Sequence, residues 1–208
     1  MAYCLKDVIK KTKGYLDDIL VVDDGSTDGT ADIAWRLGVD VISHSINRGK
    51  GAALKAGFRH AIEHGYDAVI TLDSDGQHDP KYIPEFLAAH ERFQADLIIG
   101  SRMRDKADMP FDRRCSNYLT SRSLSLLLGR YIEDSQSGYR LISARLLKSI
   151  SLKSDRFQLE TEIIIKAAQA GFKIGSVPIK VIYGREFPSS IHRFIDTFRW
   201  VQMVLEEI

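Results

Sequence analysis

Residues 68–75 read AVITLDSD, a short apolar run that ends in two aspartates separated by one serine. The apolar part predicts a buried β-strand whose carboxyl end carries the acids. Two carboxylates spaced in this way lie close enough to share a divalent cation, which can neutralise a nucleotide diphosphate. An isolated Asp-x-Asp is more simply explained as an acidic turn after a strand. The neighbouring sequence therefore has to decide between the two interpretations.

A second acidic strand end lies upstream. Residues 18–22 (DILVV) predict another buried strand, and Asp23 and Asp24 open the turn DDGSTDGT. A turn that only caps the next helix needs one acid, and two adjacent carboxylates repel each other unless something binds there. Residues 47–51 read NRGKG before a helical segment, so backbone N–H groups and Lys50 can meet a phosphate. Two acidic strand ends on one sheet predict a binding site.

Strand and helix patterns alternate through the first half of the chain. The pattern predicts strands at 18–22, 39–42, 68–72 and 95–99, and helices at 30–37, 51–63 and 80–90. Such alternation is typical of an α/β fold, a mostly parallel sheet with helices on both faces. In these sheets ligands bind beyond the carboxyl ends of the strands, where both acidic motifs lie.

The pattern changes after Gly100. Helices are expected at 117–128 and 160–170, and a strand interrupted by Pro178 at 173–183, which suggests an edge position. The 208 residues show no internal repeat, low-complexity tract or linker. A single domain, 1–208, is therefore the simplest organisation.

Composition bounds the class of protein. Hydrophobic residues make up 44% and charged residues 27%, with a net charge of +1, as in an ordinary globular protein. Residues 101–122 contain six basic residues and only three aspartates. Such a stretch suits phosphate or an anionic membrane surface, or it is a solvated charged loop. Cys4 and Cys115 match no metal-ligand spacing, so we expect reduced thiols in a cytoplasmic protein.

Membrane contact, where it occurs, is expected on one face only. No run is long and apolar enough to cross a bilayer, and no signal peptide is visible. Residues 194–205 are amphipathic, with aromatic and basic residues interleaved. This segment fits either a helix lying on the inner face of the membrane or a helix packed back onto its own domain.

Five motifs in order resemble those of the family 2 glycosyltransferases. They are residues 23–30 (DDGSTDGT), 47–51 (NRGKG), 73–77 (DSDGQ), 100–102 (GSR) and 134–140 (DSQSGYR). The resemblance spans about residues 5–200 and is strongest to the dolichyl-phosphate (polyprenyl-phosphate) mannosyl- and glucosyltransferase branch. It implies a GT-A (Rossmann-like) fold with a donor half of about 1–100 and an acceptor half of about 101–208.

The same resemblance implies the chemistry. The enzyme would be inverting, would use Mg²⁺ or Mn²⁺, and would take a nucleotide-sugar donor such as GDP-mannose or UDP-glucose. The acceptor would be a polyprenyl or dolichyl phosphate, and no nucleic acid partner is expected. Converging arginines would let a lipid phosphate approach a site that already holds a diphosphate.

Residue roles carry over by position. Donor binding falls on Val22, Asp24, Lys50 and Asp73. The metal ligands implied are Asp73, Asp75 and Gln77. Acceptor-phosphate contacts fall on Arg102, Arg113 and Arg185. The catalytic set comprises Asp75, Arg102 and Asp134.

The acceptor decides whether a base is needed. A hydroxyl acceptor requires a carboxylate to remove its proton, and Asp134 is the obvious candidate beyond the metal pair. A phosphate acceptor is already anionic, so positioning and charge neutralisation suffice. Asp134 can equally cap its loop through the N–H groups of Ser135 and Ser137. Of Glu160 and Glu162 one could face the site, although a solvated helix start explains both more simply.

The chain departs from the family pattern at its start. Members normally open with a further strand ending in Pro-x-Tyr-Asn-Glu, whereas residues 1–4 read MAYC and lead into a helix at 5–15. We therefore expect a gap in the sheet and an incomplete nucleoside site, unless the sheet rearranges or another chain fills it. Two alternatives follow: a family 2 transferase with a hydroxyl acceptor, or a truncated, inactive module that binds nucleotide.

Overall fold

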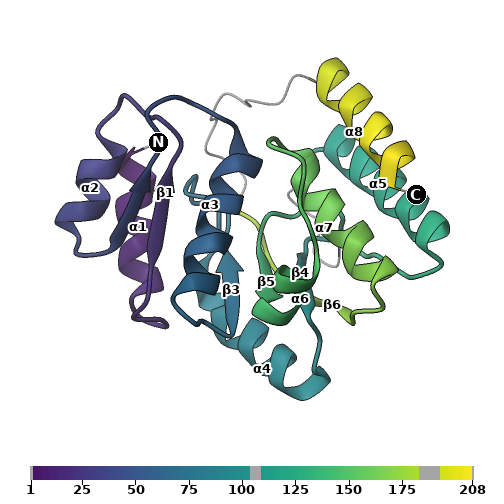
Figure 1. The fold of residues 1–208 in the computed structure, drawn as a ribbon, viewed down its shortest axis with the longest axis horizontal. Coiled ribbons are helices and arrows are strands. Elements are labelled where there is room, and N and C mark those ends of the chain that lie inside the picture. The colour runs from purple at the N-terminus through teal and green to yellow at the C-terminus, as the bar shows by residue number, and fades with distance from the viewer. Residues whose placement is uncertain (1, 104–108, 183–192, 208) are drawn as a thin grey trace.

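The computed structural model describes residues 2–103, 109–182 and 193–207, and the side chains of Ala2, Tyr3 and 193–198 are not described. Figure 1 shows helices on both sides of two central sheets. The strands are β1 (Leu20–Asp23), β2 (Asp40–Ser43), β3 (Ala68–Thr71), β4 (Leu97–Ser101), β5 (Arg140–Ser143) and β6 (Ile174–Pro178). The α-helices are α1 (Ala2–Thr12), α2 (Thr30–Arg36), α3 (Lys50–Glu63), α4 (Ile83–Phe93), α5 (Phe111–Leu128), α6 (Ala144–Ser149), α7 (Gln158–Gln169) and α8 (Arg193–Glu207).

The larger sheet has the strand order β3-β5-β4-β6. Strand β5 runs antiparallel to both of its neighbours, whereas β4 and β6 are parallel. Strands β3, β4 and β6 therefore share one direction, which confirms the mostly parallel sheet. The edge position of β6 is also confirmed. Pro178 has no backbone N–H to donate, and at the end of an edge strand this missing donor does not interrupt the sheet.

Strands β1 and β2 pair in parallel as a separate sheet. Helix α3 contacts both β1 and β3, and so joins the two sheets (Figure 1). Side chains of β3 are all half-buried, whereas those of β4 and β5 are fully buried. In the described residues β1 and β3 therefore lie in separate sheets, and the prediction that both acidic strand ends belong to one sheet is wrong.

One large cluster of buried apolar side chains draws on both halves of the chain. Apolar side chains of β4, β5 and α7 pack together there, with Leu97, Ile142 and Ile164 among the most buried. Helix α5 begins at Phe111 directly after Pro110, six residues earlier than the sequence pattern predicted. Proline fits this position because its fixed backbone angle suits a helix start.

The C-terminal helix packs on its own domain. Met203 and Val204 of α8 are buried in the main core, and Trp200 Nε1 donates a hydrogen bond of 3.1 Å to Thr161 Oγ1 on α7. Of the two interpretations of this segment, the described side chains therefore favour the packed helix. Within the described ranges, none of the helices has the length and apolar character needed to span a bilayer.

Candidate active site

The carboxyl end of β1 is fastened to the loop before α3 by one carboxylate. Asp24 Oδ2 accepts a hydrogen bond of 2.7 Å from Gly49 N, and its Oδ1 accepts one of 3.0 Å from Arg48 N. His44 Nδ1 lies 2.7 Å from the same Oδ1. Burial raises the pKa of Asp24, but these hydrogen bonds outweigh it and lower the pKa. Asp24 thus holds the NRGKG loop in place.

Lys50 stands at the first position of α3 and faces two acids. Its Nζ lies 2.8 Å from Asp73 Oδ1, just beyond β3, and 3.0 Å from Glu160 Oε1 on α7. Burial alone would lower the pKa of Lys50, but the two carboxylates raise it above its ordinary value. The pKa of Asp73 is lowered, because Lys50, His78 and Arg102 together overcome its burial. Residues far apart in the sequence thus form one charged cluster.

Gly138 lets the loop before β5 reach this cluster. A Cβ placed on Gly138 would lie 2.8 Å from Asp73 Oδ2 and 2.9 Å from both Glu160 Oε1 and Lys50 Nζ. Any side chain here would displace the ion pairs. The backbone of Gly138 is also held by Thr71 Oγ1, which donates a hydrogen bond of 2.8 Å to its carbonyl.

A buried arginine shapes the same loop. Arg140 is 1% exposed, and its guanidinium donates to the carbonyls of Ser137 (2.7 Å), Ser135 (2.9 Å) and Glu160. Burial lowers the pKa of Arg140, against the raising effect of nearby acids. The backbone of the DSQSGYR motif is therefore held by its own arginine, and this conformation places Gly138 beside the charged cluster.

The second acid of the motif lies in a tight turn. Asp75 Oδ1 accepts a hydrogen bond of 2.8 Å from Gln77 N across Gly76, whose φ is +73°. His78 is 6% exposed, stacks on Tyr139 at 5.5 Å between ring centroids, and its Nδ1 has no hydrogen-bond partner among the described residues. Burial lowers the pKa of His78. Sequence analysis did not single out this histidine.

The donor set suits a hard cation, since Asp73, Asp75 and the Gln77 amide offer oxygen ligands. Within the ranges that the structure describes, no three His, Cys, Asp or Glu side chains gather as a metal cluster. Two carboxylates and an amide leave ligand positions for a diphosphate and water. The residues present therefore fit a Mg²⁺ or Mn²⁺ ion that is bound together with a nucleotide.

Arg102 follows β4 and is held by a buried acid. Its Nε and Nη2 donate to the two oxygens of Asp134, each at 2.8 Å, and its backbone N donates to Oδ2 at 3.1 Å. Asn117 of α5 donates to Asp134 Oδ1 at 2.8 Å. Burial raises the pKa of Asp134, but Arg102 and Asn117 bring it below its ordinary value. Both carboxylate oxygens are thus occupied in positioning the arginine.

The remaining predicted residues are less connected to the cluster. Val22 lies half-buried in β1, facing Gly57 of α3. Arg113 is exposed in the first turn of α5. Arg185 lies outside the described residues.

Three buried polar residues were misjudged from the sequence. Glu160 is 9% exposed and paired with Lys50, so it is no solvated helix start; Glu162, fully buried, accepts hydrogen bonds from the backbone N–H groups of Lys153 and Ser154. Asn117 was passed over as one more polar residue of a helix, although it is 1% exposed.

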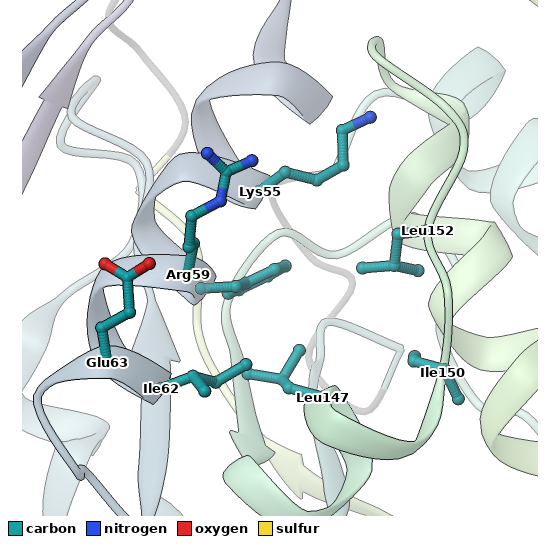
Figure 2. A pocket seen from close by; sticks show the side chains of 8 residues that line it. Lys55, Arg59, Ile62, Glu63, Leu147, Ile150 and Leu152 are labelled. Atoms are coloured by element: carbon teal, nitrogen blue, oxygen red, sulfur yellow. The ribbon is translucent and has the colours of Figure 1, made fainter.

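A separate hollow of about 270 Å³ lies between α3 and the segment after α6 (Figure 2). Its apolar lining comes from Phe58, Leu147 and Leu152, and none of the predicted site residues lines it. The Lys55 ammonium at its rim is already paired with Asp155 at 2.6 Å. The charged cluster, not this hollow, is the candidate active site.

An acid pair, a lysine and an anchored arginine follow strands of this α/β fold or stand at the start of a helix beside them, the arrangement that the resemblance to a GT-A glycosyltransferase implied. The chain belongs to glycosyl transferase family 2, whose family profile matches residues 1–153. The chain is 33% identical over 202 residues to UDP-N-acetylglucosamine–dolichyl-phosphate N-acetylglucosaminyltransferase of Methanococcus voltae (86% of this chain, 80% of the relative). It is 36% identical over 176 residues to undecaprenyl-phosphate mannosyltransferase of Micrococcus luteus (79% of this chain, 72% of the relative).

A solved structure supports the fold independently. Glucosyl-3-phosphoglycerate synthase of M. tuberculosis superposes with a TM-score of 0.73 at 20% sequence identity, over 99% of this chain and 76% of that one. A further crystal structure of that enzyme contains Mn²⁺, UDP and phosphoglyceric acid. The resemblance to family 2 and the GT-A fold class predicted from the sequence are thus confirmed.

Proposed function

We propose that this family 2 glycosyltransferase is an inverting enzyme that moves a hexose from a nucleotide sugar to a polyprenyl phosphate. GDP-mannose and UDP-glucose are the donors that we would test first. The relatives named for dolichyl- and undecaprenyl-phosphate transfer support this acceptor class. Asp73, Asp75 and Gln77 would hold Mg²⁺ or Mn²⁺, which when bound supplies positive charge to the diphosphate leaving group.

The pairing of Arg102 with Asp134 is the observation that favours a phosphate over a hydroxyl acceptor. A general base needs a free oxygen and a pKa near the working pH, whereas both Asp134 oxygens are engaged and its pKa is lowered. A phosphate acceptor needs no base, because it is already ionised. The arrangement suits a guanidinium that Asp134 holds ready for an anionic nucleophile. Arg113 and Arg185 would add positive charge to the same acceptor.

The donor half would bind the nucleotide sugar. Lys50, held at the start of α3, can donate to the diphosphate, and the backbone around Gly49 is fixed by Asp24. Val22 and Asp24 would border the nucleoside. The chemical step would then depend on bringing the acceptor phosphate to the sugar against charge repulsion, which the cations at the strand ends reduce.

The test is a transfer assay with radiolabelled nucleotide sugars, using short polyprenyl phosphates and the matching polyprenols, with and without chelator. We expect product from the phosphates only, and only without chelator. Arg102→Ala should reduce transfer by about 100-fold or more while donor binding is retained. Transfer to polyprenols, or undiminished transfer by the folded Arg102→Ala variant, would overturn the acceptor assignment.

Asp134→Asn separates the two roles of this acid. Asparagine still accepts a hydrogen bond from Arg102, so a positioning role predicts a loss of about tenfold. A base role predicts almost complete loss of transfer with a well-folded protein.

Within the described part of the chain β1 and β3 each have one unpaired edge, which favours one competing function, a module that binds nucleotide without turnover. Calorimetry with GDP and UDP in the presence of Mn²⁺ tests it. Metal-dependent nucleotide binding by a protein that transfers no sugar to any acceptor of the panel would support that alternative.

A further inference from the structure

We propose that the outward face of α5 is a docking surface for a membrane that contains anionic lipid. This α5 face consists of Phe111, Cys115, Tyr118, Leu119, Arg122 and Leu126. The inference rests on the proposed function, since a polyprenyl phosphate is held in a bilayer, and it names the surface that would bring the site to that bilayer.

The α5 face is apolar where a helix surface is usually polar. Phe111 is 79% exposed, Leu119 67% and Leu126 75%. The opposite side of the helix, with Asn117, Ser121 and Leu124, is buried against the domain. Most helices place their polar residues outward, and here the order is partly reversed. Such a large apolar face in water calls for a covering partner.

The charge of α5 selects the partner. The helix carries Arg113, Arg114 and Arg122 against the single acid Asp112, and it has no lysine or glutamate. All three arginines are exposed. A helix with apolar side chains bordered by arginines lies in the interface of a bilayer, where anionic head groups attract the guanidinium groups. A second copy of the same face would instead bring like charges together.

The α5 face reaches the residue that follows Arg102. A groove of about 340 Å³ is lined by Met103, Phe111, Arg114, Cys115 and Tyr118. Met103 directly follows Arg102, and Asn117 on the buried side of α5 holds the Asp134 that positions this arginine. A bilayer on the α5 face would therefore lie beside the proposed acceptor site.

Helix α8 extends the apolar region. Leu205 is 77% exposed and Val201 43%, while Met203 and Val204 hold the helix to the core. Helices α5 and α8 both contact α7, and Figure 1 places them at the end of the molecule opposite α1 and α2. The exposed apolar residues of α5 and α8 thus lie at one end, away from the two-stranded sheet.

Vesicle sedimentation of the whole chain tests the proposal. We expect binding to vesicles of phosphatidylcholine with phosphatidylglycerol, and weaker binding to phosphatidylcholine alone or in high salt. Leu119→Ser/Leu126→Ser should weaken binding by about tenfold or more, because two inserted leucines are lost. Trp35→Ser, which removes a 74% exposed side chain from α2, is the matched control and should bind as the unmodified protein does.

Cys115 supplies a second readout. It is exposed while Cys4 is buried, so an environment-sensitive dye can be attached to the native chain at this position. We expect a blue shift with anionic vesicles and quenching by lipids that carry a quencher near the head group. A dye that stays in water while the protein binds vesicles would place the contact elsewhere and overturn the proposal.

The outcomes separate this inference from the proposed function. Absence of vesicle binding, with sugar transfer to a short, dissolved polyprenyl phosphate, would refute the α5 face and leave the function standing. Vesicle binding that depends on Leu119 and Leu126, without any transfer, would do the reverse. Self-association that is lost in the double variant, with unchanged vesicle binding, would identify a second copy as the partner and refute the bilayer.

Discussion

Lys50 Nζ lies 2.8 Å from Asp73 Oδ1, so the first residue of α3 neutralises the acid that follows β3. Glu160 on α7 holds the same ammonium from the other side at 3.0 Å. Asp73, which we propose as a metal ligand, therefore has the positive charge of Lys50 beside it. Lys50 thus links two parts of the chain that are distant in sequence, the donor half with Asp73 and the acceptor half with Glu160.

Lys50→Met should destabilise the fold by about 2–3 kcal/mol, because Asp73 and Glu160 would face each other without a cation. Urea unfolding followed by circular dichroism measures this change. Adding Glu160→Gln to Lys50→Met removes one of the two unpaired charges and should restore part of the stability. If the double variant is less stable than the single one, repulsion between these acids is not the cause.

Gly138→Ala should disrupt the charged cluster, since its Cβ would lie within 2.9 Å of three charged atoms. We expect lower stability together with loss of nucleotide binding, read by thermal unfolding and calorimetry. Gly175→Ala in β6 is the matched control, because its Cβ would meet nothing closer than 3.7 Å. Equal behaviour of the two variants would contradict the close packing at Gly138.

Metal and nucleotide should bind together. Two carboxylates hold a divalent cation weakly, and a diphosphate would complete its oxygen ligands. Mn²⁺ titrated calorimetrically should bind about tenfold more tightly with UDP or GDP present than alone. Asp73→Asn and Asp75→Asn should each remove this coupling, whereas Asp32→Asn, an exposed acid on α2, should keep it. Tight Mn²⁺ binding that ignores the nucleotide would place the metal elsewhere.

The sequence predicted the features that depend on local pattern. Alternating runs predicted β1 to β4 and their helices. The acidic motifs do follow β1 and β3, but these two strands lie in separate sheets and not on one sheet as expected. It missed β5, because residues 140–143 are a short run whose buried Arg140 reads as polar. Its placement between β3 and β4 depends on long-range packing, which periodicity does not report.

The sequence pattern also could not predict ion pairs between residues that are distant in the chain. Glu160 pairs with a lysine 110 positions earlier, so only the fold turns it from a surface acid into part of the site. From its sequence Asp134 could be a base or a loop cap. In the structure Asp134 Oδ1 accepts a hydrogen bond of 3.2 Å from Gln136 N in its own loop, and both oxygens also accept from Arg102, a partner that the sequence did not suggest. Such pairings follow from how α7 and the loop before β5 pack against β3 and β4.

Arg102→Met should reverse the pH dependence that Asp134 contributes to stability. In the native protein Asp134 has a pKa below its ordinary value of 3.8, so its stabilising effect is present above that pH and lost as the pH falls through the folded pKa. Without the guanidinium, burial dominates and the pKa of Asp134 rises above 3.8. The variant should therefore be about 2–3 kcal/mol less stable at neutral pH and recover part of this difference as the pH falls toward the raised pKa.

Urea unfolding between pH 4 and pH 7 measures the two profiles. Arg102→Met/Asp134→Asn serves as the control, because it lacks the titrating carboxyl and should show no such recovery. Arg145→Met removes a largely exposed arginine from its bidentate pair with buried Asp96, at the opposite end of β4 from Arg102, and should lower stability slightly while leaving sugar transfer intact. If the free energy of unfolding of Arg102→Met changes with pH in parallel with that of the unmodified protein, Asp134 does not depend on Arg102 for its charge.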